Sequence, residues 1–215
     1  MKILIGYFQR SGSTLLQHIL NKHSLIRSYS DFSSFLVLPL IIAGVKPYSR
    51  ICIKPLDIFF MIRKEGFYNK FDKFVWLARD PRDSYLSAFE IKFAYNFWLP
   101  GKKLRGIDLG LLRRWQLIYH QYFKYPERWY LLRYEELVTK PKEVLSGLFQ
   151  YLQVPYEDIY PFEKHNLLSG GDPKLRKTKT IHKKSIFRYK KQMPKKQQRV
   201  FIWFLNKEMK KLGYL

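Results

Sequence analysis

Short apolar runs alternate along the chain with longer amphipathic segments. The apolar runs predict strands over residues 2–8, 73–78 and 128–132, and a fourth strand near 26–30. The amphipathic segments predict helices over residues 13–22, 83–96, 110–124, 141–152 and 195–211. Proline and glycine predict loops at 47–55 and 99–110. This order predicts a three-layer α/β fold in which helices flank a central parallel β-sheet.

The first predicted strand and helix are joined by a loop of small hydroxylated residues, Arg10-Ser11-Gly12-Ser13-Thr14. In such a connection several backbone N–H groups and the positive helix end point at one spot, which suits a phosphate or a sulfate. The loop departs from the Walker pattern, because Gly6 and Gly12 are one residue too far apart and Ser13 stands at the lysine position. The alternative is an ordinary turn capped by a hydroxyl residue.

A second segment of the same kind follows the apolar run at 74–78. It reads Leu77-Ala78-Arg79-Asp80-Pro81-Arg82-Asp83-Ser84-Tyr85-Leu86-Ser87. Pro81 and Asp83 fit the start of a helix, so Arg79 would end a strand and Ser87 would lie early in the helix. Ligands of parallel sheets bind beyond the carboxyl ends of the strands, which is where Arg10 and Arg79 are both expected.

In this order the two motifs resemble the nucleotide-binding signatures of the sulfotransferases that use 3′-phosphoadenosine 5′-phosphosulfate (PAPS), whose product is adenosine 3′,5′-bisphosphate (PAP). In that family the first motif holds the 5′-phosphosulfate, which implies cofactor contacts for Arg10, Ser11, Gly12, Ser13 and Thr14. The second motif supplies an arginine and a serine, eight residues apart, to the 3′-phosphate. Arg79 and Ser87 have that spacing. The resemblance implies a P-loop-like fold.

Later segments extend the resemblance to the C-terminus. Leu132-Arg133-Tyr134-Glu135-Glu136-Leu137 resembles the family's R-Y-E-[DE]-L segment, which implies that Tyr134 borders the adenine. The family closes its 3′-phosphate pocket from a late loop, which implies that role first for Arg188 and, as second choices, for Arg176 and Thr178. The ending Leu212-Gly213-Tyr214 recurs in bacterial members and in tyrosylprotein sulfotransferases. We therefore expect one sulfotransferase domain over residues 1–215.

The implied reaction moves a sulfuryl group from PAPS to a hydroxyl acceptor. Charge builds on the leaving 5′-phosphate oxygen in the transition state, and Arg10 with the loop N–H groups suits that oxygen. The bacterial and tyrosylprotein branches of the family carry arginine at this position. A sulfuryl group carries less charge than a γ-phosphoryl group, and the sequence has no dedicated metal cluster, so we predict a reaction without a metal.

The general base is less defined by the sequence. In the tyrosylprotein branch a catalytic glutamate follows the first motif, and the same interval from Arg10 reaches Asp31, whose side chain is one methylene shorter. Asp31 also fits the N-cap of a helix that starts at Phe32, and we weigh base and cap equally. Cytosolic members use a histidine, but no matching pattern surrounds His120, and His18 is more typical of a packed helix residue.

Composition fits one domain with a substantial core. The chain has 215 residues, of which 47% are hydrophobic and 18% aromatic, which excludes disorder. Its single cysteine, Cys52, forms no internal disulfide. The N-terminus runs directly into the first predicted strand, and the apolar stretch 35–45 is too short to span a bilayer. These features predict a cytoplasmic protein and leave peripheral membrane contact open.

The formal net charge of +23 exceeds what the cofactor motifs require. Residues 174–196 hold eleven lysines and arginines and no acidic residue. This run fits a solvated face, or the attraction of an acidic acceptor or an anionic lipid. The expected acceptor is a carbohydrate, such as an acidic glycan or a lipid-linked sugar. A P-loop kinase and a nucleic-acid-binding protein are the alternatives. The loop of this chain lacks the lysine that a P-loop kinase needs, and a nucleic-acid-binding protein would leave the ordered motifs unexplained. No assembly signature indicates the oligomeric state.

Overall fold

A parallel β-sheet forms the centre of the molecule in the computed structural model, which describes residues 1–45, 48–61, 65–90, 101–159 and 181–215. In the described part of the chain this sheet has five strands in the order β2-β3-β1-β4-β7. The strands are β1 (Lys2–Tyr7), β2 (Arg27–Ser30), β3 (Ile51–Lys54), β4 (Lys73–Ala78) and β7 (Tyr130–Arg133). Because every neighbouring pair is parallel, all carboxyl ends share one edge.

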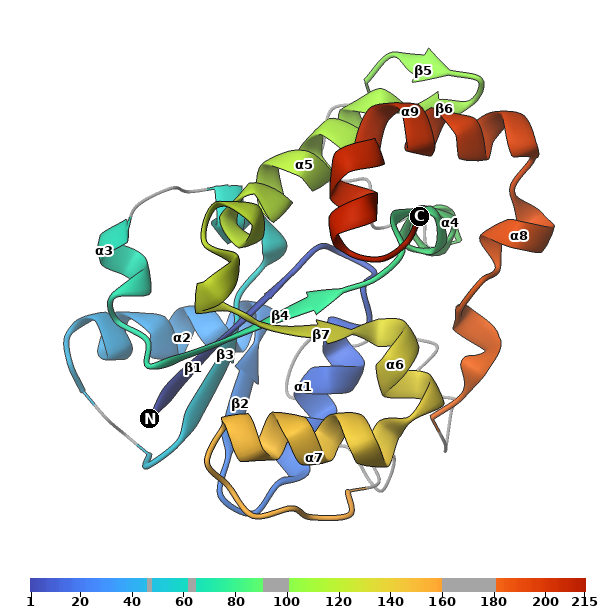
Figure 1. The fold of residues 1–215 in the computed structure, drawn as a ribbon. Coiled ribbons are helices and arrows are strands. Elements are labelled where there is room, and N and C mark those ends of the chain that lie inside the picture. The colour runs from blue at the N-terminus through green and yellow to red at the C-terminus, as the bar shows by residue number, and fades with distance from the viewer. Residues whose placement is uncertain (46–47, 62–64, 91–100, 160–180) are drawn as a thin grey trace.

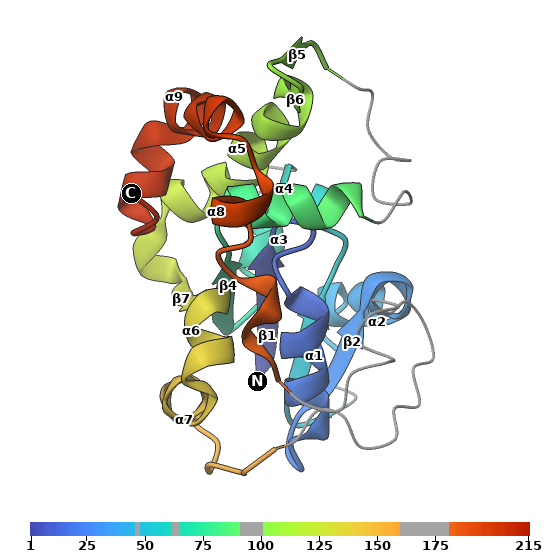
Figure 2. The ribbon, with the colours of Figure 1, turned by 90° about the vertical axis from the view of Figure 1, so that its right-hand side faces the viewer.

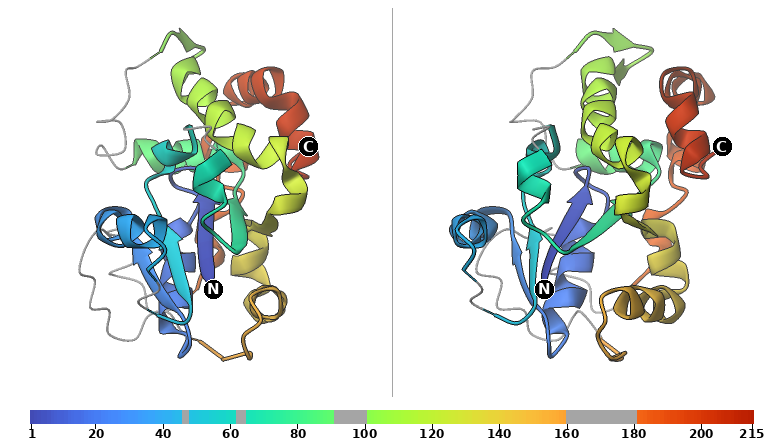
Figure 3. Two further views of the ribbon diagram at one scale, coloured as in Figure 1. Left: turned by 90° about the vertical axis from the view of Figure 1, so that its left-hand side faces the viewer. Right: turned by 60° about the vertical axis from the view of Figure 1, so that its left-hand side comes forward.

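Helices cover both faces of this sheet (Figures 1 and 2). The helices are α1 (Ser13–Lys22), α2 (Asp31–Ile42), α3 (Glu65–Tyr68), α4 (Pro81–Phe89), α5 (Leu109–Lys124), α6 (Tyr134–Thr139), α7 (Pro141–Tyr151), α8 (Tyr189–Gln192) and α9 (Lys195–Lys211), with 3₁₀ turns η1 (Asp57–Met61), η3 (Pro126–Arg128) and η5 (Lys183–Ser185). Helices α1, α6 and α7 lie on one face. Helices α2 and α3 lie on the other, with α2 at the side of edge strand β2 (Figure 3). Strands β5 (Lys103–Leu104) and β6 (Ile107–Asp108) pair as a small antiparallel hairpin.

The core is centred on β1 and β4, whose inner residues are buried on both faces. Such strands have near-continuous apolar sequences rather than alternating ones. Gly6 on β1 lets the aromatic layer approach the backbone, because a Cβ there would lie 2.3 Å from the Trp76 ring. The Trp76 ring in turn meets Trp129 edge to face, with ring centroids 4.9 Å apart. This packing fixes β1, and with it the loop that follows Tyr7.

The sequence-based elements are largely confirmed, with two errors in the loops. The strands β1, β2, β4 and β7 and the helices α1, α4, α5, α7 and α9 lie where they were predicted, although α4 starts at Pro81 and residues 91–96 of its predicted range lie outside the described residues. The prediction of loops was wrong at 47–55, which contains β3, and at 99–110, which contains the β5–β6 hairpin. The sequence of both segments contains proline or glycine beside the three short strands, and these signals outweighed the apolar content of the strands.

Helix α2 was expected only in the alternative in which Asp31 caps a helix that starts at Phe32, and it begins at Asp31 itself. Pro39 lies inside it, and its apolar residues follow no helical period, so the usual pattern signals are missing. None of the helices in the described ranges is long and apolar enough to cross a membrane.

Candidate active site

The two motifs predicted to bind the cofactor meet at the carboxyl ends of β1 and β4. Arg10 Nε donates a hydrogen bond to Ser87 Oγ on α4 at 3.1 Å, and Arg79 Nη1 donates to the Arg10 carbonyl oxygen at 2.7 Å. Ser13 and Thr14 form the first turn of α1, directly after Gly12. The sheet order therefore brings together residues that are 77 and 69 positions apart in the chain.

The loop between β1 and α1 has an unusual backbone. Arg10 has φ 63° and Gly12 has φ 91°, both in the left-handed region. A side chain at Gly12 would collide with the ring of Tyr134, since its Cβ would lie 2.3 Å from that ring. Tyr134, the first residue of α6, is thus packed onto the first motif, and the Arg79 guanidinium lies 4.6 Å from its ring centroid. The three predicted cofactor motifs form one cluster.

Two buried polar atoms in this cluster lack a partner among the described residues. They are Ser11 Oγ and Arg79 Nε, on side chains that are 1% and 4% exposed. Arg79 uses its other nitrogens to donate to the carbonyl oxygens of Arg10 and Ser185. A buried polar atom without a hydrogen bond costs about 1–3 kcal/mol. Both atoms can donate a hydrogen bond to an anion, so the residues present fit a phosphate or sulfate group.

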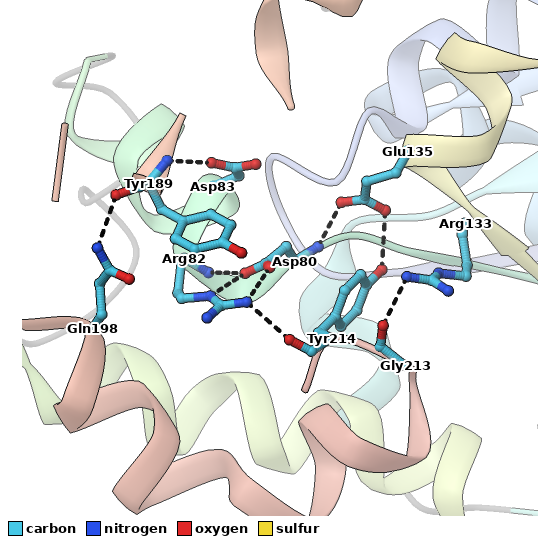
Figure 4. A network of polar contacts seen from close by, with 9 residues as sticks. All are labelled: Asp80, Arg82, Asp83, Arg133, Glu135, Tyr189, Gln198, Gly213 and Tyr214. Atoms are coloured by element: carbon cyan, nitrogen blue, oxygen red, sulfur yellow. Dashed lines mark hydrogen bonds and ion pairs between the residues drawn. The ribbon is translucent and has the colours of Figure 1, made fainter. Parts of the chain in front are cut away.

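The second motif is held by a network that reaches the C-terminus (Figure 4). Asp80 caps α4 and accepts from Arg82 Nε and Nη2 at 2.9 and 2.6 Å, a bidentate ion pair. Glu135 accepts from the Asp80 backbone N–H at 2.9 Å and from the Tyr214 hydroxyl at 3.2 Å. Burial raises the pKa of Glu135 and, together with the nearby Glu135 charge, raises that of Tyr214. The strand end that carries Arg79 is thereby fixed by β7, α6 and the last residues of the chain.

A buried ion pair holds the first loop from the other side. Asp57, the first residue of η1, accepts from Arg114 Nη2 at 2.6 Å and from the Gln9 backbone N–H at 3.0 Å. Burial raises the pKa of Asp57, while Arg114 opposes that shift. The residue before Arg10 is therefore tied to both η1 and α5.

Asp31 lies at the carboxyl end of β2, in contact with a buried lysine. Lys54, the last residue of β3, is 2% exposed, and its Nζ lies 2.8 Å from Asp31 Oδ1. The same ammonium lies 3.4 Å from the Tyr7 hydroxyl oxygen, and that hydroxyl donates to the Pro55 carbonyl at 2.8 Å. Cationic and anionic groups thus line the sheet edge from β2 across β3 to β1.

The N-cap alternative for Asp31 was wrong. Ser30 is the N-cap of α2, and its backbone N–H donates to Ser33 Oγ at 3.0 Å. Asp31 is the first helical residue and has φ 48°, a strained conformation for a residue with a side chain. Its role as a base stays a prediction.

The remaining predicted residues are less close to the cluster. Within the described residues Arg188 bonds to Glu90 at the end of α4 and to Gln192, rather than to Arg79 or Ser87. Its neighbour Tyr189 donates its backbone N–H to Asp83 Oδ1 at 2.9 Å, which brings the basic C-terminal segment beside the second motif. Arg176 and Thr178 lie outside the described residues. Of the histidines weighed as bases, His18 is buried on α1 and His120 lines a groove between α5 and α9.

Sequence reasoning missed four charged residues that shape the site: Lys54, Asp57, Arg114 and Glu135. Lys54 ends a short strand that was predicted as a loop, and Asp57 follows it, so their place at the sheet edge was hidden. Glu135 lies inside a recognised motif, but its two partners are distant in the chain. Across the residues the structure describes, no group of three metal-ligating side chains could hold a metal ion. The metal-independent reaction stays a prediction.

The fold and the site define an α/β protein with a candidate anion-binding centre at the carboxyl ends of its central strands. Residues 72–158, which carry the second and third motifs, match the model of the sulfotransferase family. Over these residues the chain is similar to the sulfotransferase family. A search of curated protein sequences found no match.

Solved sulfotransferase structures share its fold over nearly the whole chain. A sulfotransferase domain from the curacin biosynthetic pathway is 19% identical with a TM-score of 0.71, covering 94% of this chain and 96% of that one. A sulfotransferase domain of the Synechococcus PCC 7002 olefin synthase is 15% identical with a TM-score of 0.64, covering 96% and 93%. Mouse sulfotransferase SULT7A1, solved with PAP, is 15% identical with a TM-score of 0.63, covering 97% and 84%.

Proposed function

We propose that this protein transfers a sulfuryl group from PAPS to a hydroxyl acceptor, with residues 1–215 acting as one domain. The observation that carries the proposal is the meeting of Arg10, Arg79 and Ser87 at one sheet edge, where Ser11 Oγ and Arg79 Nε are buried without a partner in the described structure. PAP in the mouse relative supports the choice of cofactor.

In this proposal the two motifs divide the cofactor between them. The cofactor supplies the sulfuryl group and the phosphate that leaves. Arg10 and the N–H groups that begin α1 stabilise charge on the phosphosulfate, and the planar guanidinium suits two oxygens at once. Arg79 and Ser87 hold the 3′-phosphate. Tyr134 lies between the two motifs and borders the adenine ring of the cofactor.

Asp31 is the proposed base for the acceptor hydroxyl, with Lys54 as its positioning residue. The carboxylate remains 20% exposed, so an acceptor can reach it from solvent, while the buried ammonium fixes one of its oxygens. A base must lie within hydrogen-bond reach of the proton it removes, and a displacement of about 1 Å can cost about 100-fold in rate. The strained φ of Asp31 is consistent with a position maintained for function.

The proposed acceptor is a carbohydrate or a glycolipid, reached without a metal ion. The net charge of +23 favours anionic acceptors, because a positive surface concentrates them near the protein. The acidic glycan and the lipid-linked sugar both satisfy this condition.

The direct test is calorimetry in the absence of magnesium, comparing PAP with AMP. We expect PAP to bind more tightly, because AMP lacks the 3′-phosphate. Replacing Arg79 by alanine should weaken PAP binding by about 10- to 150-fold, the loss of about 1.5–3 kcal/mol for hydrogen bonds to a charged group. Arg113→Ala on the exposed surface of α5 is the matched control and should leave the affinity unchanged. Equal affinity for PAP and AMP, or an Arg79 variant that binds like the control, would contradict the proposal.

A second experiment separates cofactor binding from chemistry. Asp31→Asn should bind PAP like the wild type but lose transfer of labelled sulfate from PAPS to a panel of glycans and glycolipids. Arg10→Ala should lower turnover beyond its effect on binding. Unchanged transfer by both variants would remove these two residues from the mechanism.

A further inference from the structure

Helix α2 and the turn after it present an apolar surface to solvent. From Phe35 to Val45 the sequence contains no polar side chain. Leu38 and Ile41 are buried against the sheet, as expected for one face of the helix. The other face is exposed, with Leu36 at 78% and Ile42 at 47%. A helix that is apolar all round is normally buried, so an exposed one indicates a partner.

The surface continues onto the neighbouring turn. The ring centroids of Phe35 and Phe59 lie 5.3 Å apart, and Ile58, which precedes Phe59 in the chain, is 42% exposed. Helix α2 lies on the outer side of the fold next to edge strand β2 (Figure 3). We call this surface the α2 face; its members are Phe35, Leu36, Leu40, Ile42, Val45 and Ile58, all between 37% and 78% exposed.

Charge narrows the choice of partner. Residues 32–56, which include most of the α2 face, contain no acidic residue, and the whole chain has a formal charge of +23. A second copy of the chain carries the same positive charge and would be repelled. A nucleic acid offers no apolar counterpart to leucine and isoleucine side chains. An anionic lipid bilayer offers both a negative surface and an apolar interior within a few ångströms.

We propose that the α2 face docks on the interfacial region of an anionic lipid bilayer. Docking brings the proposed base close to the lipid headgroups, because α2 begins at Asp31 and Leu36 lies only about 8 Å further along the helix axis. If the proposed function also holds, the acceptor hydroxyl belongs to a lipid or a lipid-linked sugar held in that bilayer. The docking itself does not depend on the reaction.

Co-sedimentation with vesicles tests the docking. The wild type should bind vesicles of phosphatidylcholine mixed with phosphatidylserine, and bind pure phosphatidylcholine much less. The double variant Leu36→Glu, Leu40→Glu should lower the partition coefficient about tenfold or more, since two apolar side chains are lost from the contact and two negative charges are added. The control is Trp203→Glu on α9, which adds one negative charge at a residue that is 69% exposed and remote from α2 in the fold, and it should lower binding far less per added charge.

Two outcomes would overturn the proposal. An equal loss of binding per added charge in the α2 and Trp203 variants would show that net charge alone drives binding. A dimer in sedimentation velocity that dissociates in the α2 variant would assign the α2 face to a second copy of the chain. Circular dichroism and thermal unfolding check that the variants fold, and unchanged PAP affinity separates loss of docking from loss of the proposed cofactor site.

A labelled variant locates the contact directly. Cys52 is fully buried, and burial raises the pKa of its thiol to about 12, so it does not compete for a thiol reagent. In Leu36→Cys an environment-sensitive dye at position 36 should shift to the blue on vesicle addition and be quenched by brominated lipid. A dye at Trp203→Cys should show neither change. An unchanged spectrum at position 36 despite vesicle binding would overturn the proposal.

Discussion

Removing the carboxylate of Asp57 should destabilise the whole fold. Asp57 is 7% exposed and Arg114 is 3% exposed, and the carboxylate also accepts from the Gln9 N–H. Breaking a buried ion pair by deleting one partner costs about 3–5 kcal/mol, because the other charge stays in a poorly solvated site. Against a typical total of about 5–15 kcal/mol, Asp57→Ala should lose a large share of the free energy of unfolding.

Urea denaturation followed by tryptophan fluorescence measures this loss. The matched control is Glu65→Ala, which removes a surface pair with Arg128 and should cost about 1 kcal/mol or less, because Glu65 is 41% exposed. Asp57→Ala should also weaken PAP binding, since Gln9 leads directly into the first motif. A cost for Asp57→Ala no larger than that of Glu65→Ala would refute the reasoning that this pair anchors the loop.

Three further variants test separate features of the site. Gly12→Ala should lower PAP affinity and stability by more than Gly44→Ala, measured by calorimetry and urea denaturation. Both glycines have a positive φ, but only a Cβ at Gly12 would collide with Tyr134. Equal effects of the two substitutions would contradict the close packing of Gly12 and Tyr134. Burial raises the pKa of Glu135, so at a pH above the usual glutamate pKa of about 4.3 the folded state binds more protons than the unfolded state. The free energy of unfolding should therefore fall as the pH rises from that value through the raised pKa of Glu135. This fall should be smaller in Glu135→Gln, and an identical dependence on pH in both proteins would contradict the role of Glu135. Lys54→Met should leave PAP affinity unchanged but lower sulfate transfer by about tenfold or more, because Asp31 loses its fixed partner; a full rate with labelled PAPS would exclude the positioning role.

The sequence allowed most of the sheet and the meeting of the first two motifs to be predicted, because both depend on local signals. The residues around Arg10 and Arg79 carry their own turn and capping chemistry, and parallel strands bring their carboxyl ends to one edge. The strand order was not predicted, and in the structure it places β1 beside β4. The contact between Arg10 and Ser87 is a consequence of that order.

The parts that escaped prediction depend on tertiary contacts. Strand β3 has only four residues, all buried, so it shows no alternation, and the nearby prolines dominate its local pattern. Lys54 would read as a surface residue in a loop, yet the fold buries it against Asp31. The contact of Tyr214 with Glu135 joins two segments 79 residues apart, and no short-range signal in the sequence encodes it.

Three buried arginines with nearly the same exposure have different kinds of hydrogen-bond partner in this protein. Arg79, Arg82 and Arg114 are 4%, 4% and 3% exposed. Arg82 and Arg114 each bond to a carboxylate at 2.6 Å, which compensates the cost of burying their charge. Arg79 bonds instead to two neutral backbone carbonyls, and its Nε has no partner in the described residues. A fold that pairs two of its buried guanidinium groups with carboxylates, and gives the third only neutral carbonyl partners beside the first motif, keeps positive charge available where an anionic cofactor is expected.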